Sequence, residues 1–316
     1  MQRTPSFRNV SAAHKRIAGR VHETPLLSSA TLSKLAGVEV SFKCENLQKS
    51  GSFKYRGALN AVLALPAAVR KLGVATHSSG NHGAALAAVA QRFNIPATLV
   101  VPNTASAFKQ DNIRRYDGRI VHCGKTLKSR EQKLAEVLAD TGATYIPPYD
   151  HFDVIAGQGT CALEILNATA EVDEIWLPVG GGGLAAGTVL ATSDPAMTHQ
   201  DVQVVGVEPA LAGEAQVALQ THRRQPPMPP ISIADGLRAP LGHLNFKILD
   251  TYQLPVHLVS EQEIMDAQSL AMSCLKLVLE PSSAVPLAAL LKYGRWCSAS
   301  RSVVVILTGG NVQMRL

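Results

Sequence analysis

Apolar residues along this chain form short uninterrupted runs, which alternate with longer segments where apolar positions recur at helical spacing. The short runs predict buried strands at residues 38–42, 74–77, 97–101, 120–122, 174–178, 202–207, 256–259 and 302–307. The longer segments predict helices at residues 53–63, 83–93, 107–116, 129–139, 156–166, 184–191, 261–277 and 282–293. A further helix is expected near the N-terminus, from Ser11 as its cap to Gly19 as its end. Strands alternating with helices indicate an α/β fold, with mostly parallel sheets flanked by helices on both faces.

The alternation is divided into two series, which indicates two lobes. The first series predicts a small domain at residues 64–150. The second begins near residue 153, and we expect it to form a larger domain from residues 1–63 and 151–316. A length of 316 residues also exceeds the size at which one hydrophobic core stops growing.

Composition narrows the class of protein. A hydrophobic fraction of 46% and a charged fraction of 17% are typical of a soluble globular protein. The net charge of +6 raises the question of nucleic acid, but the cations are dispersed and aromatic residues make up only 5%, too few for a base-stacking surface. No apolar run approaches the roughly 18 residues of a membrane span, and the N-terminus lacks the apolar core of a signal peptide. We therefore expect a cytoplasmic protein that binds neither nucleic acid nor membrane, with its scattered cysteines reduced. These cysteines are Cys44, Cys123, Cys161, Cys274 and Cys297.

Four consecutive glycines, Gly180, Gly181, Gly182 and Gly183, separate the strand EIWLPV from a helix. Glycines let the backbone approach a ligand closely, and the free N–H groups of a helix N-terminus attract anions. The segment therefore predicts a phosphate site. Its spacing, with Ala186, also fits a loose dinucleotide-binding pattern, in which Glu208 would end the next strand, so a nicotinamide cofactor stays open at this point.

Lys54 lies at the start of a predicted helix, within the segment SGSFKYRG. Helix N-termini disfavour cations, so the helix dipole and partial burial would push this amine toward its neutral, nucleophilic form. A nearby phosphate would act in the opposite direction, and the sequence leaves the net direction open.

Two more segments follow predicted strands. His77 to Gly83, HSSGNHG, opens a helix and offers hydroxyls, an amide and backbone donors, which suit a carboxylate. Its two histidines have no third ligand at a sensible spacing for zinc. The segment LTGGN, residues 307–311, presents the Thr308 hydroxyl at the carboxyl end of the last strand, where ligands of open α/β sheets bind, although a plain glycine turn is equally compatible.

The segments SGSFKYRGA, HSSGNHGAALA, AGQGT, VGGGGLAAG, EPSSA and LTGGNV stand in the order and at the spacings of the fold-type II pyridoxal-phosphate enzymes. The chain resembles the serine/threonine dehydratase and serine racemase family from about Val21 to Val312, and this resemblance leaves the nicotinamide alternative little support. It implies a two-lobed fold similar to the tryptophan synthase β chain. Because the chain stops at Leu316, we also expect no C-terminal regulatory domain.

The resemblance implies how the cofactor, pyridoxal 5′-phosphate, is bound. Lys54 would carry it as a Schiff base, with Phe53 packed beside it, and the loop Gly180–Gly183 would hold its phosphate. Asn81 would bond the 3′-oxygen of the ring. Thr308 would face the pyridine nitrogen, and Glu280 matches a carboxylate near the cofactor. A neutral hydroxyl at that nitrogen makes the ring a weaker electron sink than a carboxylate would, which favours elimination.

The resemblance also implies a small hydroxy-amino-acid substrate. Its carboxylate would bind the loop formed by Ser78, Ser79, Gly80, Asn81 and His82, and Arg130 matches an arginine near the substrate region. Lys54, released from the cofactor, would remove the Cα proton. Ser79 matches the second acid/base that racemisation needs on the opposite face.

A divalent-cation site is a further implication of the resemblance. Glu208, the carbonyl of Ala212, and Glu214 match the racemase ligands, with Glu214 in place of the usual Asp. Oxygen ligands suit Mg²⁺, and also Mn²⁺ or Ca²⁺.

We therefore expect a homodimeric enzyme that converts L-serine or L-threonine to a 2-keto acid and ammonia by α,β-elimination. The alternative is a racemase of serine or a related amino acid, such as 3-hydroxyaspartate, with dehydratase side activity. A catalytically silent binding protein is disfavoured because Lys54 and Ser79 are intact.

Overall fold

The computed structural model describes residues 3–169, 171–194, 202–229, 231–294 and 301–313. Its larger sheet has six strands in the order β1-β2-β10-β7-β8-β9. These are β1 (Leu26–Ser28), β2 (Glu39–Cys44), β7 (Glu174–Pro178), β8 (Gln203–Pro209), β9 (Val256–Val259) and β10 (Ser302–Leu307). All neighbours are parallel except β1 and β2, which are antiparallel. The sheet is therefore mostly parallel, as the sequence predicts.

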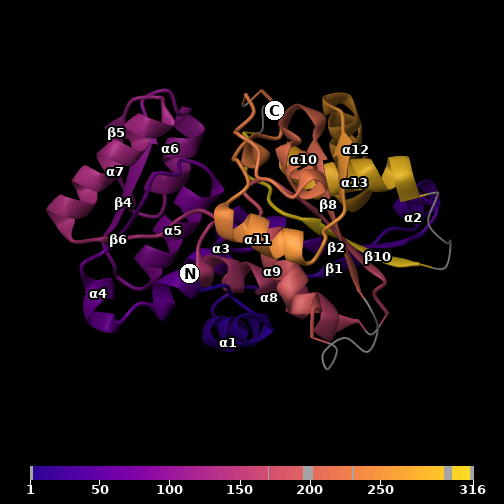
Figure 1. Ribbon diagram of the computed structural model, residues 1–316, viewed down its shortest axis with the longest axis horizontal. Coiled ribbons are helices and arrows are strands. Elements are labelled where there is room, and N and C mark those ends of the chain that lie inside the picture. The colour runs from indigo at the N-terminus through magenta and orange to yellow at the C-terminus, as the bar shows by residue number, and fades with distance from the viewer. Residues whose placement is uncertain (1–2, 170, 195–201, 230, 295–300, 314–316) are drawn as a thin grey trace.

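A second, wholly parallel sheet has four strands in the order β5-β4-β3-β6. These are β3 (Val74–Thr76), β4 (Ala97–Pro102), β5 (Arg119–Cys123) and β6 (Thr144–Tyr145). In Figure 1 this sheet and its helices form the magenta part at the left, and the six-stranded sheet lies at the right. The two sheets place a small and a large α/β unit side by side; the domain boundaries at residues 64 and 150 stay a prediction.

Helices cover both sheets. They are α1 (Phe7–Ile17), α2 (Ala30–Ala36), α3 (Lys54–Ala64), α4 (Ala67–Lys71), α5 (Asn81–Arg92), α6 (Ala107–Arg114), α7 (Leu127–Thr141), α8 (Phe152–Ala168), α9 (Gly183–Thr192), α10 (Glu214–Thr221), α11 (His243–Thr251), α12 (Glu261–Leu275) and α13 (Pro281–Tyr293). Helix α8 packs against α1, α3 and α9 on one face of the larger sheet, whereas α2, α12 and α13 pack together on the other. Buried on both faces, β7 and β10 read as continuous apolar runs, which is why they were visible in the sequence.

The N-terminal helix differs from expectation. It begins at Phe7, after Ser6, so Ser11 lies inside the helix and does not cap it. The cysteines at 44, 123, 161 and 274 are free thiols, and Cys297 lies outside the described residues.

A buried ionic cluster holds helix α3 against its neighbours. The guanidinium of Arg56 donates hydrogen bonds to both carboxylate oxygens of Glu45, at 2.7 Å each, and to both oxygens of Glu164, at 2.5 and 2.7 Å. Lys43 adds a second cation, with its Nζ 2.7 Å from Glu164. Arg56 and Glu45 are fully buried, and Arg56 is two residues beyond Lys54. The cluster therefore anchors the first turn of α3 to β2 and α8.

Candidate active site

A cavity of about 420 Å³ lies where the carboxyl ends of strands from both sheets meet. Every residue that the sequence assigned to cofactor or substrate lines it: Phe53, Lys54, Ser78, Ser79, Gly80, Asn81, His82, Arg130, Gly180, Gly181, Gly182, Gly183, Glu280 and Thr308. The expected metal ligands Glu208, Ala212 and Glu214 do not line it. Residues far apart in the sequence thus share one pocket.

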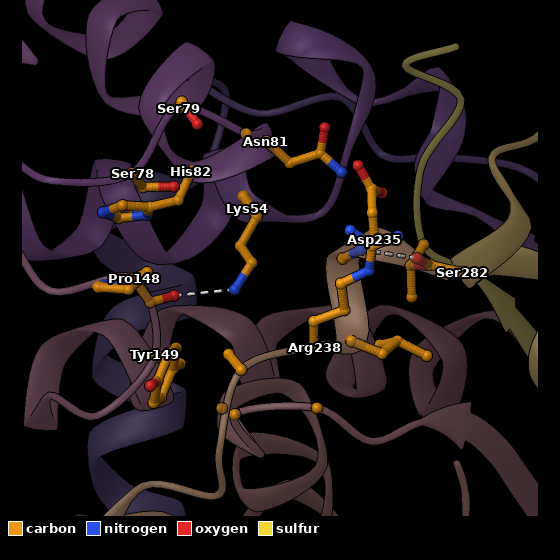
Figure 2. A pocket seen from close by; sticks show the side chains of 18 of the residues that line it. Lys54, Ser78, Ser79, Asn81, His82, Pro148, Tyr149, Asp235, Arg238 and Ser282 are labelled. Atoms are coloured by element: carbon orange, nitrogen blue, oxygen red, sulfur yellow. Dashed lines mark hydrogen bonds between the residues drawn. The ribbon is translucent and has the colours of Figure 1, made fainter. Parts of the chain in front are cut away.

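Lys54 is the first residue of α3, and its amine points into the cavity. The amine donates a hydrogen bond to the carbonyl of Pro148, at 2.8 Å (Figure 2). Burial lowers the pKa of Lys54 to about 8, against the opposing effect of the Glu280 carboxylate. The Phe53 and Tyr149 rings lie 5.0 and 6.0 Å from this amine. The neutral form is therefore far more accessible than for an exposed lysine, and it becomes a large fraction at mildly alkaline pH, which suits a nucleophile and base.

The glycine loop leaves no room for side chains. A Cβ on Gly181 would lie 2.4 Å from the Tyr149 ring, and one on Gly182 would lie 2.5 Å from Leu241. Gly182 also has a φ of +85°, in the region that favours glycine. Helix α9 begins at Gly183 and its N-terminus has no side-chain cap. Its first N–H groups are thus available to an anion.

A second uncapped helix N-terminus faces the same cavity. Gly80 stands at the cap position of α5 and forms no side-chain cap, and the half-buried Ser78 and Ser79 precede it. His82 Nε2 lies 2.9 Å from the carbonyl of Ile146, and burial lowers the pKa of His82 to about 3. This imidazole is therefore neutral. The His77 ring stacks on Tyr145, so both histidines have protein partners and neither is placed as a zinc ligand.

Asn81 and Glu280 meet across the cavity. The Asn81 amide donates to both Glu280 oxygens, at 2.8 and 2.9 Å. Burial raises the pKa of Glu280 to about 7, against the hydrogen bond from Asn81. Asn311 in turn donates to Asn81, at 2.8 Å. Thr308 is buried at the end of β10, with its hydroxyl 3.2 Å from that of Ser283.

Cations from both α/β units line the outer part of the cavity. Lys109 of α6 pairs with Asp235 at 2.5 Å, Arg238 donates to the carbonyl of Ser232, and Nε of Arg130 is buried without a hydrogen-bond partner. Figure 2 shows Asp235 and Arg238 across the cavity from Ser78 and His82. Sequence reasoning missed Pro148, Tyr149, Lys109, Asp235, Arg238 and Asn311 as lining residues. Only Asn311 had a signal, because it belongs to the quoted segment LTGGNV.

Glu208 and Glu214 lie near each other, outside the cavity. The Glu208 carboxylate accepts hydrogen bonds from the backbone N–H groups of Ala215 and Gln216, at 3.1 and 2.8 Å. Glu208 is thus not placed as a ribose ligand of a nicotinamide cofactor. Burial raises the pKa of Glu208 to about 8, the two N–H groups oppose this, and Glu214 adds to it. Glu214 Oε2 is buried without a hydrogen-bond partner. Two crowded carboxylates with an unsatisfied oxygen fit a divalent cation chemically, although no group of three His, Cys, Asp or Glu side chains suited to a metal occurs among the described residues.

Comparisons with known proteins agree with the pocket. The family model for pyridoxal-phosphate dependent enzymes matches residues 17–309. The beta-hydroxyaspartate dehydratase of Paracoccus denitrificans is 41% identical over 310 residues, covering 98% of this chain and 97% of the relative. The serine racemase of Arabidopsis thaliana is 39% identical, covering 97% of this chain and 93% of the relative. The crystal structure of serine racemase from Dictyostelium discoideum superimposes with a TM-score of 0.93 and 38% identity, covering 99% of this chain and all of that one.

No helix in the described parts of the chain is long and apolar enough to cross a membrane. The match spans both α/β units and every residue that lines the cavity except Asn311. The chain therefore belongs to the pyridoxal-phosphate dependent enzymes of fold type II, as an enzyme of the ammonia-lyase or amino-acid racemase type.

Proposed function

We propose that the protein deaminates L-serine, L-threonine or a related β-hydroxy amino acid by α,β-elimination, giving a 2-keto acid and ammonia. One observation carries the proposal: the Lys54 amine lies in a cavity that two uncapped helix N-termini share. One terminus suits the cofactor phosphate and the other the substrate carboxylate. The amine between them is partly neutral because burial lowers its pKa to about 8.

The residues of the cavity fit pyridoxal phosphate. The backbone N–H groups of Gly180–Gly183 would hold the phosphate, and Lys54 the aldehyde carbon. Phe53 would pack beside the ring, Asn81 would donate to its 3′-oxygen, and Thr308 would face its nitrogen. When bound, the cofactor supplies an electron sink for the Cα carbanion.

Proton transfer at Cα is assigned to Lys54. The hydrogen bond to Pro148 orients the amine, and its neutral form accepts the Cα proton. The β-hydroxyl would then leave as water with the proton that Lys54 has taken up, giving an enamine of the substrate. Addition of water to its imine form releases ammonia and the keto acid. Elimination therefore needs only one positioned base.

Racemisation is the second candidate, favoured by the presence of Ser79 in the same cavity. A second acid/base opposite Lys54 would return the proton to the other face of Cα. Figure 2 shows Lys54 between the segment that carries Ser79 and Tyr149. Serine racemases among the relatives support this candidate.

Further parts of the proposal concern assembly and metal. The carbonyl of Ala212 and the carboxylates of Glu208 and Glu214 would bind Mg²⁺, Mn²⁺ or Ca²⁺ and offset the cost of burying two like charges. We also propose a cytoplasmic homodimer, in which residues 1–63 and 151–316 form the cofactor-binding domain and residues 64–150 the substrate-binding domain.

The deciding experiment incubates the purified, cofactor-loaded protein with L-serine, L-threonine and 3-hydroxyaspartate in parallel. Keto acid, ammonia and the enantiomers of the remaining substrate are measured together, with Lys54→Ala as control. Elimination is expected to exceed racemisation for the preferred substrate. Formation of D-serine from L-serine faster than pyruvate would favour the racemase, and absence of all products would refute both functions.

A further inference from the structure

We propose that Asn311 is a positioning residue that fixes which way round the Asn81 amide faces the cofactor. The inference rests on the proposed function, in which Asn81 donates to the 3′-oxygen of pyridoxal phosphate. It gives a role to the asparagine of the LTGGNV segment.

Asn311 uses its amide nitrogen to hold two partners at once. Its Nδ2 donates to Oδ1 of Asn81, at 2.8 Å, and to the carbonyl of Ser50, also at 2.8 Å. An amide nitrogen carries two hydrogens, so both are engaged. The oxygen of the Asn81 amide is therefore held toward Asn311, and its nitrogen is turned toward Glu280 and the cavity.

The direction matters because one end of an amide donates hydrogen bonds and the other accepts them. If the Asn81 amide turned over, its nitrogen would face that of Asn311, donor against donor. Above the pKa of Glu280, which burial raises to about 7, the amide oxygen would face an ionised carboxylate, acceptor against acceptor, and would offer no donor to a ring oxygen. Asn311 and Glu280 thus select the same orientation from opposite sides.

The surrounding backbone is built around the Asn311 side chain. A Cβ on Gly51 would lie 2.4 Å from Asn311 Oδ1, and Gly51 has a φ of +74°, so both space and conformation favour glycine there. The N–H of Gly310 donates to the carbonyl of Gly51, at 3.0 Å. The backbone N–H of Asn311 also acts on the Glu280 carboxyl, lowering its pKa against the effect of burial. Asn311 therefore holds Asn81 by a hydrogen bond and lies beside Glu280, the other partner of the Asn81 amide.

These bonds connect the two α/β units at the reacting lysine. Asn81 opens α5, which packs on β3 and β4 of the four-stranded sheet, whereas Asn311 follows β10 of the six-stranded sheet. Ser50 lies just before Lys54 in the chain. Asn311 therefore fixes the position of the Asn81 amide, which would contact the ring, relative to the segment that carries Lys54.

The test compares Asn311→Ala and Asn81→Ala with a matched control, Asn46→Ala. Asn46 is also buried, and its amide donates to the carbonyl of Val278, which lies beside Gly310. Unlike Asn311, Asn46 does not line the cavity. The readouts are the visible absorption maximum of the bound cofactor and its dissociation constant. Asn311→Ala is expected to reproduce most of the spectral shift of Asn81→Ala and to weaken cofactor binding about 3- to 10-fold, the equivalent of one lost hydrogen bond. Asn46→Ala is expected to leave both unchanged.

The double variant separates positioning from general support of the loop. If Asn311 acts through Asn81, adding Asn311→Ala to Asn81→Ala changes neither readout further. Asn311→Ser is a milder replacement because it keeps a polar side chain. Its hydroxyl is too short to reach Asn81, so this variant should match Asn311→Ala. An unchanged spectrum in both Asn311 variants, or additive effects in the double variant, would overturn the inference. A wild-type protein without a visible cofactor band would instead refute the proposed function.

Discussion

Replacing Arg56 by Met tests the buried cluster behind Lys54. Methionine keeps the apolar stem of the side chain but is shorter, and the substitution removes the four hydrogen bonds that the fully buried guanidinium donates to Glu45 and Glu164. These two carboxylates are left with Lys43 as their remaining cation. Breaking a buried ion pair on one side costs about 3–5 kcal/mol. Since the free energy of unfolding of most domains is only about 5–15 kcal/mol, we expect Arg56→Met to remove a large part of it at pH 7.5.

The loss should depend on pH in a defined direction. In the wild type, burial would raise the pKa of Glu45, but the charge and hydrogen bonds of Arg56 outweigh it and hold that pKa below its usual value. Glu45 is thus ionised in the folded and unfolded wild type at any pH well above 4.5. Without Arg56, burial dominates and the folded variant takes up a proton that the unfolded chain does not bind. Its stability then recovers as the pH falls, by up to about 1.4 kcal/mol per pH unit for that proton.

Urea unfolding followed by far-ultraviolet circular dichroism, at pH 7.5 and 5.5, measures both effects. Arg114→Met is the matched control, because Arg114 pairs with Asp111 on the exposed surface of α6 and should contribute about 0–1 kcal/mol. A loss below about 1 kcal/mol for Arg56→Met at pH 7.5, or a loss that grows on acidification, would refute the reasoning.

Four further predictions concern the site. Borohydride reduction of the loaded enzyme followed by peptide mapping should label Lys54, and Lys54→Ala should abolish catalysis; a label on another lysine would exclude this assignment. Gly182→Val should weaken cofactor affinity at least tenfold, because its φ of +85° and the 2.5 Å approach of Leu241 exclude a branched side chain, and equilibrium titration measures this. Chelation should lower the melting temperature and Mg²⁺, Mn²⁺ or Ca²⁺ should restore it if Glu208 and Glu214 bind a cation; indifference of metal-free protein to added cation would argue against the site. Ser79→Ala should retain much of the L-serine elimination while losing any D-serine formation, as measured by chiral chromatography, and equal loss of both would contradict separate roles for Lys54 and Ser79.

The sequence predicts well those elements in which the apolar positions recur at one clear spacing. Strands buried on both faces, such as β7 and β10, are continuous apolar runs. Short or weakly patterned elements were missed: β1 has three residues and β6 two, and α11 begins with His243 in a segment that mixes apolar and polar positions. Their structure depends on partners that are distant in sequence, such as β2 for β1. Local pattern cannot supply this information.

The candidate site could be assembled from the sequence only where its residues belong to contiguous segments. Gly180–Gly183 and Ser78–His82 each carry a helix start and a ligand surface within a few residues. Pro148 and Tyr149 have no such local mark, because they reach Lys54 through the packing of α8 against α3. The direction of the Lys54 pKa shift, open at the level of sequence, follows from burial in the folded pocket.

The position of β10 has a consequence for the order of folding. Residues 302–307 pair with residues 39–44 on one side and 303–305 with 174–176 on the other, so the centre of the larger sheet is occupied by its last strand in chain order. During synthesis β2 and β7 both leave the ribosome long before the strand that joins them. Until then each exposes an unpaired edge, which makes this stage slow and prone to aggregation. Thr308 and Asn311 directly follow β10 in the chain. The complete pocket therefore cannot bind its cofactor until β10 has paired with β2 and β7.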